Sequence, residues 1–310
     1  MLYKKILDAN ISRLVLGSAL FGTAVTEEKS FAIMRKYFDF GGNTIDTARV
    51  YGSWNNNSKG ASERTVGKFL KENDLRNKAY ILTKAGHPLP ESMLVPRLSK
   101  EEIISDVEES LIDLGIDAID ALFLHRDDES RSVGEIMETL NLLIKQGKVK
   151  TIGVSNWKNS RVLEANQYAE ENNLDKLVGN ELEYSFTQIN SDFVTDPLCY
   201  HLEDDERIYC NENDFPVFAY SSQASGLFYF IEKANGDISK LSEFLTKKFI
   251  NAETLNKLNK VIAIAKQYGI SYTAASVGLI LRENRAICPI IGPTEEEHLI
   301  DSLSALKLFE

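Results

Sequence analysis

The segment at positions 119–125 reads Ile-Asp-Ala-Leu-Phe-Leu-His, a short apolar run that ends in an ionisable residue. Such a run, flanked by polar residues, predicts a buried β-strand. Two earlier segments have the same form, because Asn43–Asp46 ends in a carboxylate and Tyr80–Lys84 ends in an amine. Helical segments separate the three runs, as in a parallel sheet whose strand ends meet at one edge. These strands therefore predict one site at that edge.

The alternation of strand and helix continues along the chain and gives eight units. Eight units allow either a closed (β/α)8 barrel or a doubly wound open sheet. No GxGxxG motif follows the first strand, which favours the closed TIM barrel, and one domain over residues 1–310 suits that fold. Strands are expected at Arg13–Gly17, Asn43–Asp46, Tyr80–Lys84, Ile119–His125, Thr151–Val154, Leu177–Leu182, Pro216–Tyr220 and Ala286–Ile291, and helices at Glu27–Phe40, Ser62–Lys71, Lys100–Leu114, Val133–Gln146, Asn159–Asn172, Asn251–Tyr268 and Glu295–Leu306.

Turn and cap signals support these helix bounds. A capping box is expected at Ser99 to Glu102, and Gly115 and Gly147 stand where helix ends favour a left-handed residue. Two connections, Gly52–Gly60 and Ser221–Phe249, are too long for simple turns. We interpret them as candidate lids or substrate walls at the carboxyl ends of their strands.

The composition narrows the class of protein. The formal charge of −11 repels phosphate backbones and anionic headgroups, so we expect neither nucleic-acid nor membrane binding. No apolar run reaches about 18 residues, and residues 1–8 lack a signal peptide's apolar stretch, so a cytoplasmic location is expected. The three cysteines have no CxxC spacing and are expected as reduced thiols, neither disulfide-bonded nor bound to zinc. The oligomeric state does not follow from the sequence.

Tyr51 lies five positions after Asp46, so its phenol can fold back over the strand end that holds the carboxylate. A tyrosine ordinarily loses its proton at about pH 10, and an ammonium such as Lys84 stabilises the phenolate. Asp46 supplies a counter-ion to Lys84, and His125 can hydrogen-bond a substrate oxygen held by Tyr51. The four residues are predicted to form a device for proton transfer and oxyanion stabilisation.

In these motifs the chain resembles the aldo-keto reductase superfamily over nearly its whole length. The resemblance implies an enzyme that reduces or oxidises a carbonyl or alcohol with NADP(H) or NAD(H). It also implies that Tyr51 is the general acid, that Lys84 and Asp46 tune its pKa, and that His125 orients the carbonyl. The matching segments are Asn43-Thr44-Ile45-Asp46-Thr47-Ala48, Tyr51-Gly52, Ala61-Ser62-Glu63-Arg64-Thr65-Val66-Gly67, Ile81-Leu82-Thr83-Lys84, Leu122-Phe123-Leu124-His125 and Ile152-Gly153-Val154-Ser155-Asn156.

The resemblance further implies where the cofactor binds. Ser155 and Asn156 match the pair that holds the nicotinamide carboxamide, and Tyr220 matches the ring on which nicotinamide stacks. Glu181 stands where the family usually has glutamine. An amide donor is thereby replaced by a group that only accepts when ionised, and we expect the pKa of Glu181 to be raised. The remaining expected cofactor contacts are Gly17, Ser18, Ser221, Gly292, Thr294, His298 and Ser302.

Resemblance and local charge disagree about which cofactor is preferred. Members that prefer NADPH usually have lysine or arginine near the position of Thr294, because the 2′-phosphate needs cationic donors. Here Glu295, Glu296 and Glu297 follow instead. These residues either select against the phosphate, which makes NAD(H) plausible, or only complement a helix dipole. Both interpretations stay open.

The residues after His125 suggest a polar pocket. Arg126, Asp127 and Asp128 can form a solvated loop, bind hydroxyls of a sugar-like substrate, or hold a metal. A metal is not expected, because no second cluster has ligand spacing. Trp54 and Trp157 lie just past strands and either stack on substrate or pack in the core. These five residues are the expected substrate contacts, whereas His87 and His201 have no partners with triad-like spacing.

Two functional classes remain at this stage. The first is an NAD(P)H-dependent oxidoreductase of a small polar, sugar-like carbonyl or alcohol. The alternative is a non-catalytic, nicotinamide-binding redox-sensor subunit, because barrels of the resembled superfamily also regulate channels. The complete set of Asp46, Tyr51, Lys84 and His125 favours the enzyme, since a pure binding module has less need of all four.

Overall fold

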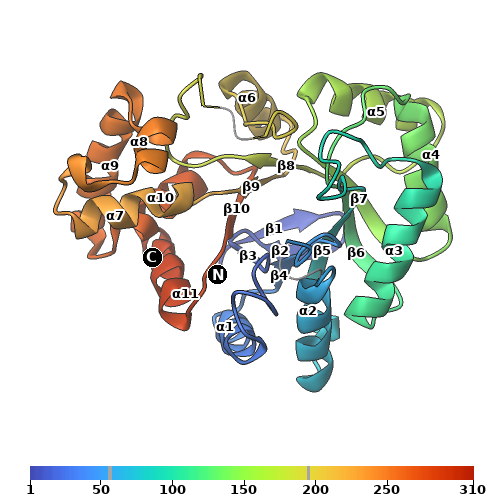
Figure 1. Ribbon diagram of the computed structural model, residues 1–310, viewed down its shortest axis with the longest axis horizontal. Coiled ribbons are helices and arrows are strands. Elements are labelled where there is room, and N and C mark those ends of the chain that lie inside the picture. Colours follow the sequence, from blue (N-terminus) through green and yellow to red (C-terminus); the bar gives the residue numbers. More distant parts are fainter. Residues whose placement is uncertain (55–57, 194–195) are drawn as a thin grey trace.

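A computed structural model describes residues 1–54, 58–193 and 196–310. Eight parallel strands close into a barrel in the order β10-β3-β4-β5-β6-β7-β8-β9, with helices around it (Figure 1). The predicted (β/α)8 TIM barrel is confirmed. The barrel strands are β3 (Val15–Gly17), β4 (Thr44–Asp46), β5 (Tyr80–Ala85), β6 (Ile119–Leu124), β7 (Val149–Ser155), β8 (Asn180–Glu183), β9 (Val217–Tyr220) and β10 (Ile287–Ile291).

The strand register brings the polar strand ends to one rim. Gly17 pairs with Asp46 and Ser155 pairs with Glu181, so these residues lie at the carboxyl ends of adjacent strands. Strands β5 and β6 are buried along their whole length, as expected for a parallel strand covered on both faces. The rim is therefore carried by strands with a buried core.

The outer helices largely follow the predicted segments. The capping box at Ser99 is present, and Gly115 and Gly147 have left-handed φ values of 62° and 74°. The helices that were predicted are α1 (Glu27–Asp39), α2 (Ala61–Glu72), α3 (Lys100–Leu114), α4 (Val133–Lys145), α5 (Asn159–Glu171), α9 (Ala252–Tyr268) and α11 (Glu296–Leu303).

Several elements were not predicted. The sequence pattern did not predict helix α10 (Tyr272–Glu283). Every residue from Thr273 to Leu281 is buried, so the helix has no polar face that would reveal a helical period. The segment after β9 is not an irregular loop, because it contains α7 (Leu227–Lys233) and α8 (Glu243–Phe249), and α7 packs beside α10. Helix α6 (Asp204–Glu212) follows β8.

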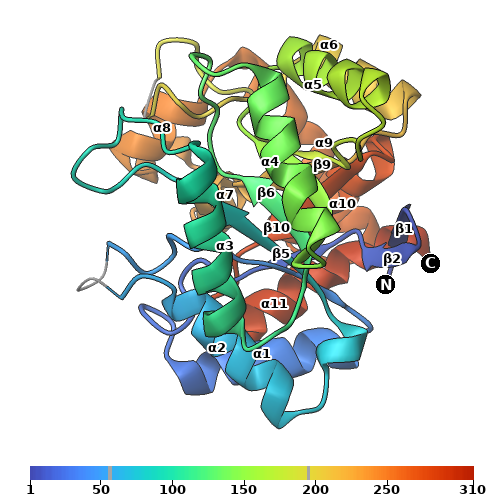
Figure 2. The same cartoon turned by 90° about the vertical axis from the view of Figure 1, so that its right-hand side faces the viewer.

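The chain begins with a hairpin, β1 (Tyr3–Ile6) and β2 (Ala9–Ser12), that was also not predicted. Its buried Ile6 and Ile11 pack against the barrel interior, including Leu82. The same cluster contains Val15 and Tyr80, the first residues of β3 and β5, so the hairpin closes the end of the barrel away from the carboxyl ends of the strands (Figure 2). The predicted loop Gly52–Gly60 lies partly outside the described residues. Within the described ranges, no helix is both long and apolar enough to cross a membrane.

Candidate active site

The structure gathers Asp46, Tyr51 and Lys84 around one buried ammonium group. Lys84 Nζ contacts Asp46 Oδ2, donates to the carbonyl oxygen of Thr47 at 3.0 Å, and lies 3.4 Å from Tyr51 Oη. Glu181 Oε2 lies 3.3 Å from the same nitrogen. Lysine is rarely buried unless paired, and here Asp46 of β4 is the close counter-ion of Lys84.

Tyr51 reaches this cluster because the chain continues to bond to β5 after β4 has ended. Thr47 N donates to Leu82 O at 2.9 Å, and Arg49 N donates to Lys84 O at 3.0 Å. The chain then turns sharply at Gly52, whose φ is 97° and where a β-carbon would lie 2.2 Å from Ser58 O. Only glycine tolerates that turn, and Tyr51 directly before it stays over the strand end.

The phenol of Tyr51 holds its proton more tightly than an ordinary tyrosine. Burial raises the pKa of Tyr51, Lys84 lowers it, and the carboxyl groups of Asp46 and Glu181 raise it again, so the net direction is upward. Lys84 acts in the direction expected from the sequence, but it does not bring the phenolate into the neutral range by itself. Tyr51 is therefore present as the acid.

His125 completes the group as a neutral imidazole. Its ring meets that of Tyr51 edge to face, with 5.9 Å between centroids, and that of His87 at 4.6 Å. Burial, with the nearby His87, Arg126 and Lys84, lowers the pKa of His125 well below its usual value. A neutral imidazole offers one donor and one acceptor, so His125 can hydrogen-bond a substrate oxygen without carrying charge.

Two carboxyl groups compete for the single positive charge of Lys84. Burial raises the pKa of Asp46, and Lys84 partly offsets that rise. Burial and the charge of Asp46 raise the pKa of Glu181 well above its usual value, the direction expected from the sequence. Asp46 contacts Lys84 Nζ directly, whereas Glu181 Oε2 makes no hydrogen bond among the described residues, so Glu181 is the carboxyl group that takes up a proton more readily.

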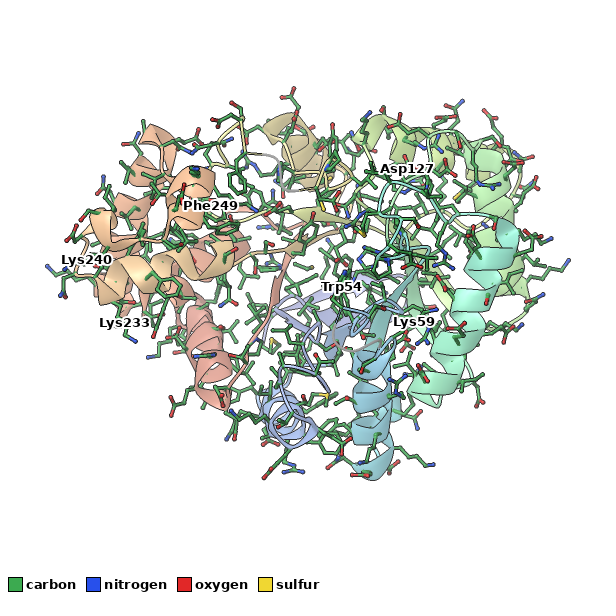
Figure 3. The ribbon with its side chains drawn as sticks, in the orientation of Figure 1. Trp54, Lys59, Asp127, Lys233, Lys240 and Phe249 are labelled. Atoms are coloured by element: carbon green, nitrogen blue, oxygen red, sulfur yellow. The ribbon has the colours of Figure 1, made fainter. Side chains whose placement is uncertain are left out.

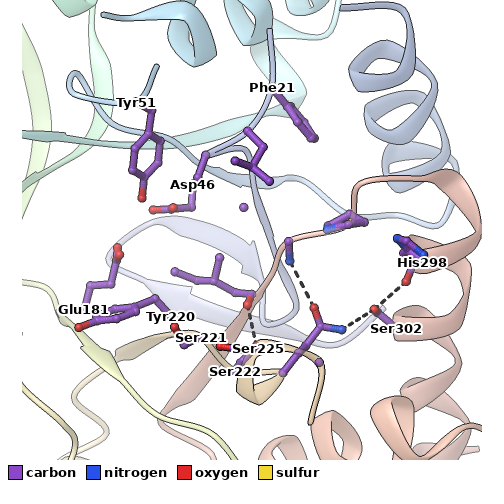
Figure 4. Close-up of a pocket in the computed structure, with 18 of the residues that line it drawn as sticks. Phe21, Asp46, Tyr51, Glu181, Tyr220, Ser221, Ser222, Ser225, His298 and Ser302 are labelled. Atoms are coloured by element: carbon purple, nitrogen blue, oxygen red, sulfur yellow. Dashed lines mark hydrogen bonds between the residues drawn. The ribbon is translucent and has the colours of Figure 1, made fainter. Parts of the chain in front are cut away.

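These groups open into a cavity of about 730 Å³. Figure 4 shows Tyr51, Asp46 and Glu181 at one end and His298 and Ser302 at the other, with Tyr220 and the Ser221–Ser225 turn along one side. Thirteen predicted residues line the cavity: Gly17, Asp46, Tyr51, His125, Arg126, Ser155, Asn156, Glu181, Tyr220, Ser221, Gly292, His298 and Ser302.

At the Tyr51 end, the predicted nicotinamide residues hold one another in place. Asn156 has a left-handed φ of 62°, and its Oδ1 accepts from Tyr220 Oη and Tyr200 N, both at 2.9 Å. Ser155 Oγ donates to the carbonyl oxygen of Glu181 at 3.0 Å. With Glu181 Oε2 close by, these groups place hydrogen-bond donors and acceptors along one end of the cavity.

At the other end of the cavity, Gln223 is the centre of a chain of hydrogen bonds that the sequence did not predict. Its Oε1 accepts from Gly292 N at 3.4 Å, its Nε2 donates to Ser302 Oγ at 2.9 Å, and Ser302 donates to His298 O at 2.7 Å (Figure 4). Ser221 and Ser225 have left-handed φ values of 53° and 52°, which are strained for non-glycine residues. The family resemblance had indicated Ser221, whereas only its position after a strand could have indicated Ser225.

Several predicted contacts lie elsewhere. Ser18 is buried behind the rim, where its hydroxyl donates to Asp46 O at 2.7 Å. Thr294 Oγ1 lies 3.1 Å from His298 Nδ1, so it adjoins the cavity through His298. Trp54 is 55% exposed, and its ring meets that of His87 edge to face, with 5.6 Å between centroids.

Asp127, Asp128 and Trp157, which were predicted to contact the substrate, are not among the described residues that line this cavity. Trp157 is fully buried, and its Nε1 donates to Arg126 O at 3.2 Å. Asp127 pairs with Arg161 at 2.7 Å, and Asp128 pairs with Arg131 at 3.2 Å. The partner of Asp127 lies on α5 and that of Asp128 in the loop before α4, and Figure 3 shows Asp127 well apart from Trp54.

Comparison with known proteins gives a family match across the barrel. The Aldo/keto reductase family matches residues 13–310. The chain is 28% identical to an aryl-alcohol dehydrogenase of Pestalotiopsis microspora, over 97% of this chain and 76% of that protein. It is also 28% identical to norsolorinic acid reductase B of Dothistroma septosporum, with the same coverage, and to an uncharacterized oxidoreductase of Bacillus subtilis, over 96% of this chain and 88% of that protein.

Proposed function

The chain belongs to the aldo/keto reductase family and is an oxidoreductase of carbonyl or alcohol substrates, and on this premise we propose that it reduces a small polar carbonyl compound with Tyr51 as the proton donor. The observation that carries the proposal is the phenol of Tyr51, which lines the cavity beside Lys84 and the neutral ring of His125. Repeated turnover of an aldehyde with a nicotinamide cofactor tests it. A single burst of cofactor oxidation without turnover would instead favour a redox-sensing subunit.

Tyr51, Lys84 and His125 have different roles in proton transfer. Tyr51 enters the reaction protonated, because its pKa lies above the usual value, and gives that proton to the developing alkoxide. Lys84 then stabilises the phenolate left behind, since its own charge is secured by Asp46. His125 donates a hydrogen bond to the same substrate oxygen, which holds the carbonyl in place.

The family generally uses a nicotinamide cofactor, and the cavity suits one. When bound, the reduced nicotinamide supplies the hydride that the substrate carbon accepts. Ser155, Asn156 and Glu181 would hold its carboxamide, and Tyr220 would lie against its ring. The turn at Ser221 and the far wall at His298 and Ser302 would hold the rest of the dinucleotide.

A raised pKa for Tyr51 also predicts a difference between the two reaction directions. Reduction needs the phenol and therefore proceeds near neutral pH. Oxidation of an alcohol needs a base, which Tyr51 becomes only as the pH approaches its raised pKa. We expect the optimum for alcohol oxidation to lie at higher pH than that for carbonyl reduction. Initial rates in both directions across one pH series would check this, and coincident optima would contradict it.

Arg126 supports a polar substrate. Its side chain is nearly buried at the cavity wall, donates to His125 O at 2.9 Å and to Asp196 at 3.2 Å, and has no partner for Nε within residues 1–54, 58–193 and 196–310. An unpaired buried donor costs about 1–3 kcal/mol unless a ligand satisfies it. We therefore propose that Arg126, held by Asp196, is the polar substrate contact, and that Asp127 and Asp128 are not.

We expect hydroxylated aldehydes to be reduced with higher kcat/KM than long apolar aldehydes, because their hydroxyl groups can satisfy Arg126. Arg126→Met should abolish this preference. The exposed Arg64→Met is a matched control. If apolar aldehydes are better substrates of the wild type by tenfold, about 1.4 kcal/mol, the polar pocket is disproved. Aromatic aldehydes belong in the panel because one relative is an aryl-alcohol dehydrogenase.

The residues after β10 set the preference between NADPH and NADH, and we propose that the enzyme can use NADH. Glu295 pairs with Lys29, and Thr294 lies beside His298. Arg282 and Arg285 precede β10 and so lie toward the opposite end of the barrel from Thr294. A charge-assisted hydrogen bond to the 2′-phosphate contributes about 1.5–3 kcal/mol to the binding free energy. Losing one or two such bonds removes most of the preference for NADP over NAD.

The ratio of dissociation constants for NADP and NAD at one ionic strength checks this prediction. We expect the two to differ by much less than a hundredfold. Tighter binding of NADP by a hundredfold or more would mean that Lys29 leaves Glu295 for the 2′-phosphate. Lys29→Met would then weaken NADP binding alone, whereas it should affect both cofactors equally if our proposal holds.

A further inference from the structure

The ammonium of Lys84 has more hydrogen-bond acceptors around it than it has N–H groups to donate. It can donate three hydrogen bonds. Asp46 Oδ2 and the carbonyl oxygen of Thr47 are its nearest acceptors. One N–H then remains for Tyr51 Oη at 3.4 Å and Glu181 Oε2 at 3.3 Å, so the last two groups compete for it.

Electrostatics decides this competition. An ionised Glu181 would put two carboxylates and one ammonium in a fully buried cluster, which leaves one negative charge uncompensated. A charged acceptor also attracts the remaining N–H more strongly than the neutral phenol does. A protonated Glu181 removes both effects, because the acid group is neutral and attracts the ammonium only weakly.

We propose that Glu181 is a positioning residue that acts through Lys84: protonated, it leaves Lys84 directed at Tyr51, and ionised, it draws the third N–H of Lys84 away and disables Tyr51. This inference rests on the proposed function of Tyr51. It gives the enzyme a loss of reductase activity toward high pH that begins before Tyr51 itself ionises. The proton lost by Glu181 passes to solvent through the cavity that both residues line.

The groups that face Glu181 from neighbouring elements are few. Asp46 comes from β4, Lys84 from β5 and Tyr51 from the loop after β4. In the barrel wall, Glu181 pairs with Ser155 of β7 and Phe218 of β9, neither of which titrates in the relevant range. Its raised pKa follows from burial and Asp46, in agreement with the geometry.

Infrared spectroscopy of the cofactor-free protein tests the protonation state without any turnover. The difference spectrum between wild type and Glu181→Gln at neutral pH should show the carbonyl stretch of a protonated carboxyl group, which the variant lacks. Carboxylate bands in its place would overturn the proposal. Because no cofactor or substrate is present, this outcome is independent of whether Tyr51 is the acid. If the variant does not fold, a pH titration of the wild-type acid band gives the same answer.

The kinetic test compares the pH dependence of kcat for aldehyde reduction. One pH unit above the midpoint of Glu181 ionisation, wild-type kcat should have fallen about tenfold, whereas Glu181→Gln should show no such fall until Tyr51 ionises. Glu206→Gln is the matched control, because its amide oxygen can still accept from Asn159 N as Glu206 Oε1 does at 2.9 Å, and its profile should follow the wild type.

Coincident profiles for Glu181→Gln and wild type would overturn the proposal. A change confined to the KM of the cofactor would also overturn it, because it would show contact with the cofactor and no action through Lys84.

Discussion

Replacement of Tyr51 by phenylalanine should lower kcat for carbonyl reduction by about 10²–10⁴-fold, the usual contribution of a general acid. The variant loses only the hydroxyl that lies 3.4 Å from Lys84 Nζ, and it keeps the ring that packs edge to face on His125. Cofactor affinity should therefore change little. Stopped-flow turnover and a cofactor titration by fluorescence measure the two effects separately.

Tyr80→Phe is a suitable control for this experiment. It removes another buried phenol hydroxyl, which lies 3.0 Å from Thr151 Oγ1 on the side of the barrel interior away from the cavity. Turnover by Tyr80→Phe should stay close to that of the wild type. If Tyr51→Phe itself retains more than roughly a tenth of wild-type turnover, Tyr51 is not the acid.

The parts of this site that the sequence predicts well are those fixed by strand ends. Asp46, Lys84 and His125 end apolar runs, and the closed barrel leaves one place where such ends can meet. Tyr51 could be predicted as well, because a short segment tied to β5 carries it. Local patterns and one architectural rule were sufficient for these four positions.

The parts that the sequence predicts poorly depend on contacts made across the fold. Asp127 follows a strand end as His125 does, but Arg161 from α5 pulls it outward, and no local pattern shows that pairing. Gln223 joins the cavity through Ser302, which is 79 positions away. Helix α10 is buried nearly all round, so the periodicity that reveals other helices is missing. Loops and fully buried helices are thus the limits of the sequence-based interpretation.

Replacement of Lys84 by methionine should have the second large effect, a loss of reductase activity together with an upward shift of the alkaline limb. Methionine fills much of the same volume but cannot stabilise the phenolate of Tyr51. Without the ammonium, the pKa values of Tyr51 and Glu181 rise further, because Lys84 lowers both of them in the wild type. The pH dependence of kcat checks the shift. An unchanged profile with weaker substrate binding alone would assign Lys84 a different role.

The same variant should also lose stability, and the sign of its pH dependence follows from Asp46. Breaking a buried ion pair costs about 3–5 kcal/mol when the remaining charge is left unpaired. Asp46 avoids part of that cost by keeping a proton, so its pKa in the folded variant lies above that in the unfolded chain. Between those two pKa values the folded state binds the extra proton, and the free energy of unfolding falls as the pH rises. Urea denaturation of Lys84→Met at several pH values should show this decline relative to wild type, whereas Lys145→Met, at an exposed lysine of α4, should run parallel to wild type. A constant difference between Lys84→Met and wild type at every pH would mean that Asp46 does not depend on Lys84 for its charge, and the tuning of Tyr51 by this pair would then fail with it.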